Sequence, residues 1–251
     1  MWPRVVLSGL VLFIILTAIA PVWAADDHDP SAGLSAPIFA IKESGASVDP
    51  ATAARLAAAF GATWQKWIDP ETSNAWNAAE LKQIRAILDD TLAALSDVGL
   101  DGAALLAGYR FRRVAGEYVR PDKQYVALAN HEQQTIILGT AAFVRLQGFY
   151  IYHELGHAVD HRLERRLGDA FHSQAGSGYT AKQQWLTGAG YWMRPHARDA
   201  RSEATADAFA LWVSSNYGKR RPPVFGGSPA DLNYESIGLA AQGALHSMVS
   251  E

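Results

Sequence analysis

The stretch His153-Glu154-Leu155-Gly156-His157 constrains this chain more than any other part of its 251 residues. It lies in the run GFYIYHELGHAVDHRLERRLG, whose pattern of apolar residues favours a helix. A helix turns about 100° per residue, so the two histidines stand about 40° apart on one face, one turn from each other. Two imidazoles placed in this way can share one metal ion, while Glu154 can reach a water molecule on that ion. The motif therefore predicts a metal centre built on a helix.

The other residues of this helix indicate how it packs. An apolar stripe lies roughly opposite the two histidines and consists of Ile151, Leu155, Ala158, Val159 and Leu163. The histidines lie outside this stripe, which favours ligands over buried core residues. Asp160 returns to the histidine face one turn beyond His157, where its carboxylate can hold an imidazole N–H. Gly156 lowers helix stability, which suggests that another backbone or a substrate passes close to it.

A third ligand is expected on a later helix, over residues 198–216 (RDARSEATADAFALWVSSN). Glu203 and Asp207 are four residues apart and share one face of it, together with Ala206 and Ala210, which are small enough to let a second helix approach closely. Two neutral imidazoles and one carboxylate leave a tetrahedral Zn²⁺ with one open position for water. We therefore expect Glu203 as the third ligand and Asp207 as the acceptor of a ligating histidine N–H.

The N-terminus has the three-part layout of a secretory signal peptide. Arg4 precedes an apolar run over residues 5–20, and Val22 and Ala24 stand three and one residues before a cleavage point after residue 24. We expect a signal peptide over residues 1–24 and a secreted or periplasmic protein without stable membrane association after cleavage. A retained membrane anchor is the alternative. The sequence contains no cysteine, which excludes a disulfide and a cysteine-linked lipid anchor.

Composition is that of a globular protein, with 49% hydrophobic and 19% charged residues. The formal net charge of −3 gives no indication of nucleic acid or of an anionic membrane surface as a partner. After a flexible leader over residues 25–48, we expect one domain over residues 49–251. It comprises a helical scaffold lobe over 49–100 and a core over 104–217 that carries the metal site.

The coarse pattern of elements predicts an α+β fold class. Apolar periodicity indicates helices at 50–67 and 75–95, and a last helix at 231–248. Short runs of β-branched and aromatic residues indicate strands at 109–119, 124–129 and 134–138, with a turn at 130–133. The resulting hairpin leads into the motif helix, which is expected to begin near Ala142. A small sheet therefore precedes the motif helix, and a helix that bears Glu203 follows it.

The two motifs together resemble a known family. HELGHAVD at 153–160, followed by EATADAF at 203–209, is similar to the catalytic domain of anthrax lethal factor and its secreted relatives, including the Pro-Pro endopeptidases. The resemblance covers about residues 120–217 and implies a zincin-like, gluzincin-type zinc endopeptidase that acts on protein or peptide substrates. It implies that His153, His157 and Glu203 bind the zinc ion and that Glu154 is the general base. It also implies that Asp207 lies next to the ligands without binding the ion itself.

The chain departs from the family pattern at one functional position. The family carries a tyrosine seven residues before the ligand glutamate, where it stabilises the oxyanion, and here that position is His196. An imidazole N–H can serve the same purpose. Tyr191, in the aromatic-rich segment 169–197, is the alternative. The expected catalytic residues are therefore Glu154 with His196 or Tyr191.

Three other interpretations stay open. Peptidases related to the CAAX prenyl proteases, membrane-embedded or periplasmic, combine HExGH with a later Glu-x-x-Ala-Asp, but no further apolar span is found in this sequence. A non-catalytic binding module with a zincin fold would use the aromatic cleft, although it has no chemical need for Glu154. A structural zinc site usually has four protein ligands and no adjacent general base, which disfavours it here.

Overall fold

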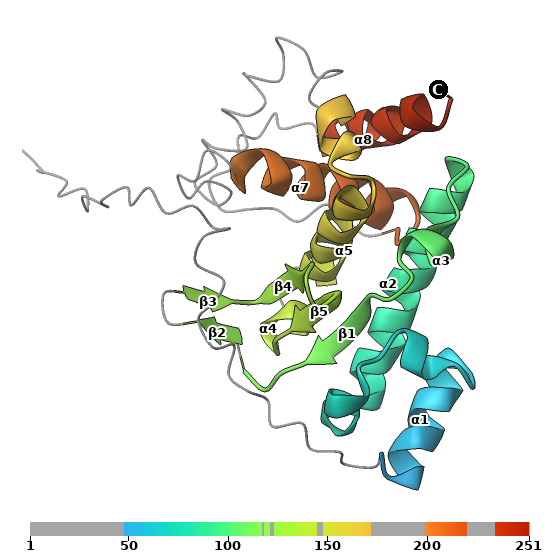
Figure 1. Ribbon diagram of the computed structural model, residues 1–251, viewed down its shortest axis with the longest axis vertical. Helices are drawn as coiled ribbons and strands as arrows, with labels where there is room; N and C mark the ends of the chain where they lie inside the picture. The colour runs from blue at the N-terminus through green and yellow to red at the C-terminus, as the bar shows by residue number, and fades with distance from the viewer. Residues whose placement is uncertain are drawn as a thin grey trace, which may run out of the picture. The chain divides into compact units, whose positions relative to one another are not determined.

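Helices and a small sheet make up the part of the chain that the computed structural model describes, so the fold is mixed α+β, as predicted (Figure 1). The described residues are 48–116, 118–120, 123–144, 148–171, 199–219 and 234–250, all within one compact unit over Ala40–Glu251. The expected signal peptide and nearly all of the expected leader lie outside them. Among the described residues, no helix combines the length and apolarity needed to cross a bilayer.

The first helix, α1 (Pro50–Phe60), begins as the sequence predicts, with Asp49 as its cap and Pro50 at its first position. The Asp49 side chain accepts a hydrogen bond from the Thr52 amide at 2.9 Å. The predicted end near Trp67 is wrong, because the chain turns at Gly61, whose φ of 78° is left-handed. A short 3₁₀ turn, η1 (Trp64–Lys66), follows and keeps Trp64 buried, which is why the apolar pattern continues beyond the helix.

The long helix α2 (Ala78–Asp97) supplies much of the core beneath the sheet. It starts at a capping box: the Asn77 side chain accepts from the Glu80 amide, and the Glu80 carboxylate accepts from the Asn77 amide. The predicted start at residue 75 is early because a 3₁₀ segment, η2 (Pro70–Ala75), occupies that stretch. A single turn, α3 (Gly102–Leu105), links α2 to the sheet.

The larger sheet has the strand order β1-β5-β4. Its strands are β1 (Arg110–Arg113), β4 (Ala127–Asn130) and β5 (Thr135–Leu138). β5 is central, and all four of its residues are buried, which accounts for its nearly unbroken apolar run. β4 and β5 form the predicted antiparallel hairpin. β1 pairs with β5 in parallel, a pairing that the sequence analysis did not predict.

The strand predicted over 109–119 is wrong in extent. The chain leaves the larger sheet after Val114 and passes through Gly116, whose φ is 71°. A separate two-stranded sheet then forms from β2 (Tyr118–Arg120) and β3 (Lys123–Tyr125), which are antiparallel. Residues 67–69 cover the outer side of β1 through hydrogen bonds with Phe111. β4 therefore forms the other border of the described sheet.

The motif helix, α5 (Phe149–Arg162), starts later than predicted. A separate turn, α4 (Ala141–Val144), occupies the expected start, and Gly148 precedes α5 with a left-handed φ of 83°. A side chain at residue 148 would also meet Gln83 and Ile87 of α2, so the glycine lets the chain bend against that helix. The apolar periodicity continues across this bend. The sequence pattern therefore predicted one helix where the structure has two.

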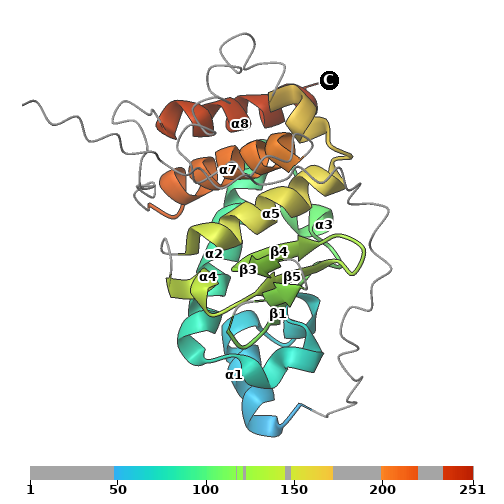
Figure 2. The same cartoon turned by 90° about the vertical axis from the view of Figure 1, so that its left-hand side faces the viewer.

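Two further helices complete the described fold, α7 (Asp199–Asn216) and α8 (Tyr234–Val249). Figure 2 shows α5 between the larger sheet and α7, and α7 between α5 and α8. The contact of α5 with β4 on one side and with α7 on the other leaves α5 almost entirely enclosed. This enclosure places the histidines of the motif between the sheet and α7.

Candidate metal centre

The crossing of α5 and α7 depends on two small residues. A methyl group added to Gly156 would lie 3.0 Å from both the Cα and the carbonyl oxygen of Ala206, closer than nearly all contacts of real side chains. The backbone of α7 therefore passes directly over the glycine in the motif, as the sequence predicted. Ala206 and Ala210 are both buried at this crossing face. The close approach brings Glu203 of α7 within reach of the histidines of α5.

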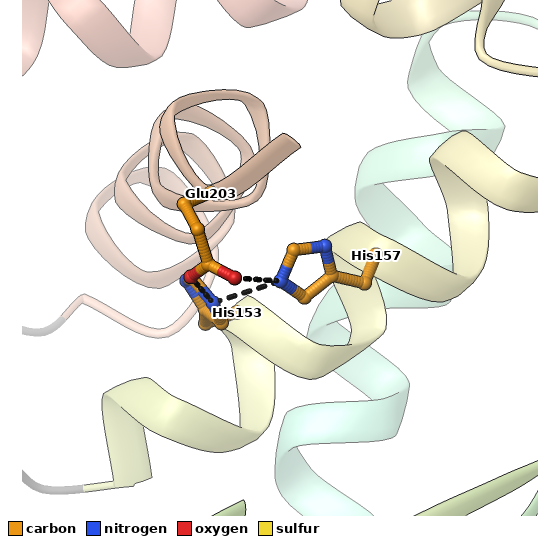
Figure 3. Close-up of side chains that lie close together, drawn as sticks. All are labelled: His153, His157 and Glu203. Carbon is orange, nitrogen blue, oxygen red and sulfur yellow. Dashed lines mark hydrogen bonds and ion pairs between the residues drawn. The ribbon is translucent and has the colours of Figure 1, made fainter. Parts of the chain in front are cut away.

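Three ligand-type side chains converge at this crossing, and Figure 3 shows them turned toward one another. Nε2 of His153 lies 3.0 Å from Nε2 of His157 and 3.0 Å from Oε2 of Glu203. Oε1 of Glu203 lies 3.4 Å from Nε2 of His157. The two imidazole planes are nearly perpendicular, at 88°. Two nitrogens and one carboxylate thus surround a common point.

These separations suit one small divalent cation. Ligand atoms around a tetrahedral ion with bonds of about 2.05 Å lie about 3.3 Å apart, close to the 3.0 to 3.4 Å found here. The His153 and His157 side chains are 8% and 11% exposed, whereas that of Glu203 is 44% exposed. Protein therefore encloses the cluster on the histidine side, whereas the described residues leave the Glu203 carboxylate partly exposed.

Asp207 holds His153 from behind. Its Oδ1 lies 2.6 Å from Nδ1 of His153, so the carboxylate accepts the Nδ1 proton and leaves Nε2 to face the cluster. This is the contact that the sequence predicted for Asp207. Burial disfavours a charged imidazole, but the carboxylates of Asp207 and Glu203 together outweigh it and raise the pKa of His153 well above its usual range.

The site carries an excess of carboxylates. Burial opposes the ionised form of Glu203, but hydrogen bonds from both imidazoles overcome it and hold the pKa of this carboxyl well below its usual range. Burial raises the pKa of Glu154. The carboxyl groups of Glu154, Glu203 and Asp207 thus lie near two imidazoles, and burial raises the pKa of Asp207 to about 7. A divalent cation would favour the ionised form of all three carboxyl groups.

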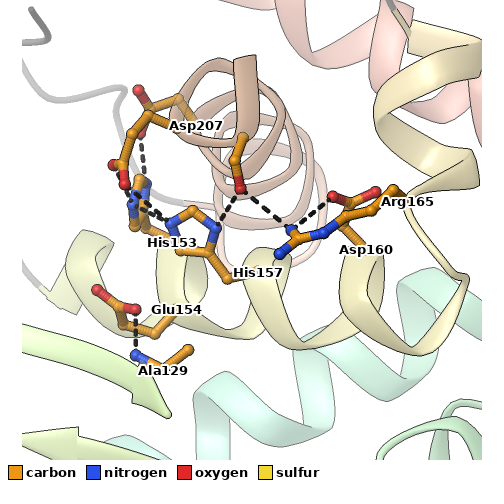
Figure 4. A network of polar contacts seen from close by, with 9 residues as sticks. Ala129, His153, Glu154, His157, Asp160, Arg165 and Asp207 are labelled. Atoms are coloured by element: carbon orange, nitrogen blue, oxygen red, sulfur yellow. Dashed lines mark hydrogen bonds and ion pairs between the residues drawn. The ribbon is translucent and has the colours of Figure 1, made fainter. Parts of the chain in front are cut away.

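The partner of His157 differs from the one predicted. Nδ1 of His157 lies 3.2 Å from Oγ of Ser202, on the first turns of α7. The carboxylate of Asp160, expected to hold an imidazole, instead accepts from the Gly168 amide at 2.9 Å and from Nη1 of Arg165 at 3.1 Å. That expectation is wrong because the chain folds back after α5 and brings these two donors to Asp160. Figure 4 shows the resulting chain of polar contacts.

Glu154 leaves α5 on the side that faces the sheet (Figure 4). Its Oε2 accepts a hydrogen bond of 2.7 Å from the backbone N–H of Ala129, in β4. Glu154 is 7% exposed as a whole residue and adjoins His153 in sequence. One oxygen is thus fixed by the border strand of the sheet. The motif glutamate is therefore held between β4 and the two histidines.

A second cluster lies at the end of α5. The hydroxyl of Tyr109 is 2.8 Å from Nδ1 of His131 and 3.2 Å from Nδ1 of His161. The two imidazoles are stacked in parallel with centroids 4.2 Å apart. The sequence analysis placed His131 in a polar turn, and the turn is present over 131–134, but the ring is half-buried. Burial, chiefly, lowers the pKa of His131 to about 3.

The structure thus brings together His153, Glu154, His157, Glu203 and Asp207 of the predicted site residues. Asp160 lies further away and reaches His157 only through Arg165 and Ser202. His196 and Tyr191 lie outside the described residues. The sequence analysis missed Ser202, whose one signal is its place next to Glu203, and it missed the backbone of Ala129. No family model, no curated protein and no solved structure matches this chain.

Proposed function

We propose that this protein is a zinc-dependent endopeptidase with a zincin-like, gluzincin-type site. His153, His157 and Glu203 bind the ion, and Glu154 acts as general base. The observation that carries the proposal is the convergence of these three ligand atoms within 4.8 Å of one another, next in sequence to the buried Glu154. A structural zinc site would be expected to close with a fourth protein ligand.

The ligand set and the glutamate have complementary roles. Zinc bound to two imidazoles and a carboxylate would lower the pKa of a water molecule on it and polarise a carbonyl group. Glu154 would take the proton of that water and pass it to the leaving amine. Burial raises the pKa of Glu154, which favours uptake of a proton from that water. Its hydrogen bond to the Ala129 amide fixes one oxygen and leaves the other for this exchange.

The substrate we propose is an extended stretch of protein or peptide. β4 borders the described sheet, lies against α5 and contacts Glu154 through Ala129. An extended peptide can add a strand to such a border, with its scissile bond toward the metal. His196 or Tyr191 would stabilise the oxyanion. The expected signal peptide would direct this activity to the periplasm or the outside of the cell.

Zinc content and peptide cleavage test the proposal together. The purified protein is expected to hold about one zinc per chain, and Glu203→Ala is expected to lose it. Glu132→Ala, in the exposed turn after β4, is the matched control and should keep the metal. Glu154→Gln should keep zinc and its contact with β4 but lose cleavage of a peptide library by at least about 100-fold, the scale of general-base catalysis.

The outcomes separate the alternatives. A folded wild-type protein that takes up no zinc, even after zinc is added back, would overturn the proposal. Zinc uptake with no cleavage, and peptide binding that Glu154→Gln leaves unchanged, would instead identify a non-catalytic binding module of zincin type. Cleavage by Glu154→Gln at the wild-type rate would refute the mechanism while leaving the metal site intact.

A further inference from the structure

His157 and His153 face the same cluster but have different partners behind them. Nδ1 of His153 contacts the Asp207 carboxylate, whereas Nδ1 of His157 contacts the Ser202 hydroxyl at 3.2 Å. Arg165 reaches the same hydroxyl oxygen, with Nη1 3.2 Å from Oγ. Nδ1 of His153 therefore faces a negatively charged group. Nδ1 of His157 faces a neutral hydroxyl, which the Arg165 guanidinium also contacts.

Hydrogen-bond chemistry determines how His157, Ser202 and Arg165 must be arranged when His157 binds a metal. An imidazole that offers the Nε2 lone pair carries its proton on Nδ1, and this N–H needs an acceptor. The Ser202 oxygen has two lone pairs. The Arg165 guanidinium is a donor only, so it occupies one of them and leaves the other for the Nδ1 proton of His157.

The position of Arg165 is set by the chain reversal after α5. Arg165 has a left-handed φ of 67°, and its backbone N–H donates to the carbonyl oxygen of Asp160 at 2.8 Å. The Asp160 carboxylate, only 4% exposed, accepts from Arg165 and from the Gly168 amide. Asp160 therefore holds the guanidinium against Ser202. The end of α5 and the start of α7 are thus joined through the hydroxyl that contacts His157.

We propose that Ser202 is a positioning residue for the metal centre. Its hydroxyl keeps His157 in the form with Nδ1 protonated and Nε2 turned to the ligand cluster, and Arg165 and Asp160 hold that hydroxyl in place. The inference rests on the proposed zinc site and adds to it the residues that orient its second histidine. It also explains why Asp160 is buried although it touches neither imidazole.

Zinc affinity, measured by competition with a chelator of known affinity, tests this role. Ser202→Ala is expected to weaken zinc binding about 10- to 100-fold, the usual effect of losing a hydrogen-bond partner of a ligating histidine. Ser202→Thr keeps the hydroxyl and should restore affinity to within about threefold of wild type. Ser214→Ala is the matched control on the same helix, because its buried hydroxyl has no hydrogen-bond partner.

A second pair of variants does not depend on the folding of Ser202→Ala. Arg165 is half exposed, so Arg165→Met should fold. This variant is expected to weaken zinc binding less than Ser202→Ala does. Arg166→Met, at the next exposed position, should leave affinity unchanged. In the zinc-loaded protein, the Nδ1 proton of His157 should be visible by NMR and exchange with water at least about tenfold faster in Ser202→Ala.

The possible results are distinct. In one result, the wild type binds zinc while both Ser202→Ala and Arg165→Met keep the same zinc affinity and the same proton exchange. This result would overturn the positioning role and leave the proposed metal site standing. Absence of zinc from the folded wild type would overturn the metal site, and this inference with it. Equal weakening by Ser202→Thr and Ser202→Ala would assign the effect to packing and also overturn the role of the hydroxyl.

Discussion

Oδ1 of Asp207 lies 2.6 Å from Nδ1 of His153, while Oδ2 of the same carboxylate is buried and has no hydrogen-bond partner among the described residues. Asp207→Asn keeps an acceptor for the histidine proton but removes the negative charge that makes the imidazole a better ligand. We expect zinc affinity to fall about 10- to 100-fold, as measured by chelator competition. Asp89→Asn, on the exposed side of α2, is the control. An Asp207→Asn protein with wild-type affinity would rule out this role.

Gly156→Ala tests the crossing of α5 and α7. The new methyl group would lie 3.0 Å from backbone atoms of Ala206, and backbone cannot easily move away. Helix propensity alone would favour alanine by about 1 kcal/mol, but overpacking costs about 1 to 3 kcal/mol or more. We expect net destabilisation and weaker zinc binding, measured by urea unfolding and by chelator competition.

Gly168→Ala is the matched control for this substitution. Gly168 is also helical, but its added methyl group would meet its nearest neighbour, Oγ1 of Thr205, at 3.4 Å, an ordinary contact. We expect it to fold with wild-type stability or up to about 1 kcal/mol more. If both alanine variants behave alike, the close approach at Gly156 does not control the crossing.

Arg113→Met tests the ion pair that joins β1 to α2. Arg113 donates to Glu80 through Nη2 at 2.9 Å, and the two side chains are 9% and 10% exposed. Removing the cation leaves a buried carboxylate without its partner, which costs about 3 to 5 kcal/mol. Arg85→Met breaks the exposed pair with Asp89 and should cost less than about 0.5 kcal/mol. Similar urea midpoints for the two variants would contradict this expectation.

His131 should make stability depend on pH. Its ring is stacked on His161 and contacts Tyr109, and burial, with the charges of His161, His157 and Arg165, lowers its pKa from 6.5 to about 3. Between these values the unfolded chain binds a proton that the folded ring does not, so the free energy of unfolding decreases as pH falls from 6.5 to about 3.

His131→Asn should remove this part of the pH dependence. Between pH 6.5 and pH 3, the free energy of unfolding of His131→Asn should fall by about 1 to 2 kcal/mol less than that of the wild type. This value allows for partial solvent exposure of the ring. Urea unfolding of chelator-treated protein over this range measures the difference. His246→Asn, on the exposed side of α8, controls for the removal of a histidine. Parallel pH profiles for wild type and His131→Asn would show that His131 is not responsible.

Local periodicity accounts for what the sequence predicted correctly. The spacing of His153, His157 and Gly156 fixes their angles around a helix, and the spacing of Glu203 and Asp207 does the same on the next one. Once both segments are helical, a glycine opposite Ala206 leaves few ways to cross them. The ligand cluster could therefore be assembled from two short motifs without knowledge of the rest of the fold.

Contacts that depend on chain reversals could not be predicted in this way. Arg165 meets Ser202 only because residues 163–168 turn back after α5. The parallel pairing of β1 with β5 joins segments about 25 residues apart and leaves no local pattern. The helix break at Gly148 was overlooked because apolar residues on both sides of it face the same core.

The enclosure of α5 has a consequence for how the protein tolerates mutation. Eleven of its fourteen residues are buried, including Phe149 and every position from 151 to 160. A helix at a surface can vary freely along its solvent side, so a scan of all substitutions usually shows tolerance every three or four positions. Here each change falls either in packed core or among the residues of the candidate metal centre. Such a scan should therefore find one nearly continuous intolerant block from 149 to 160.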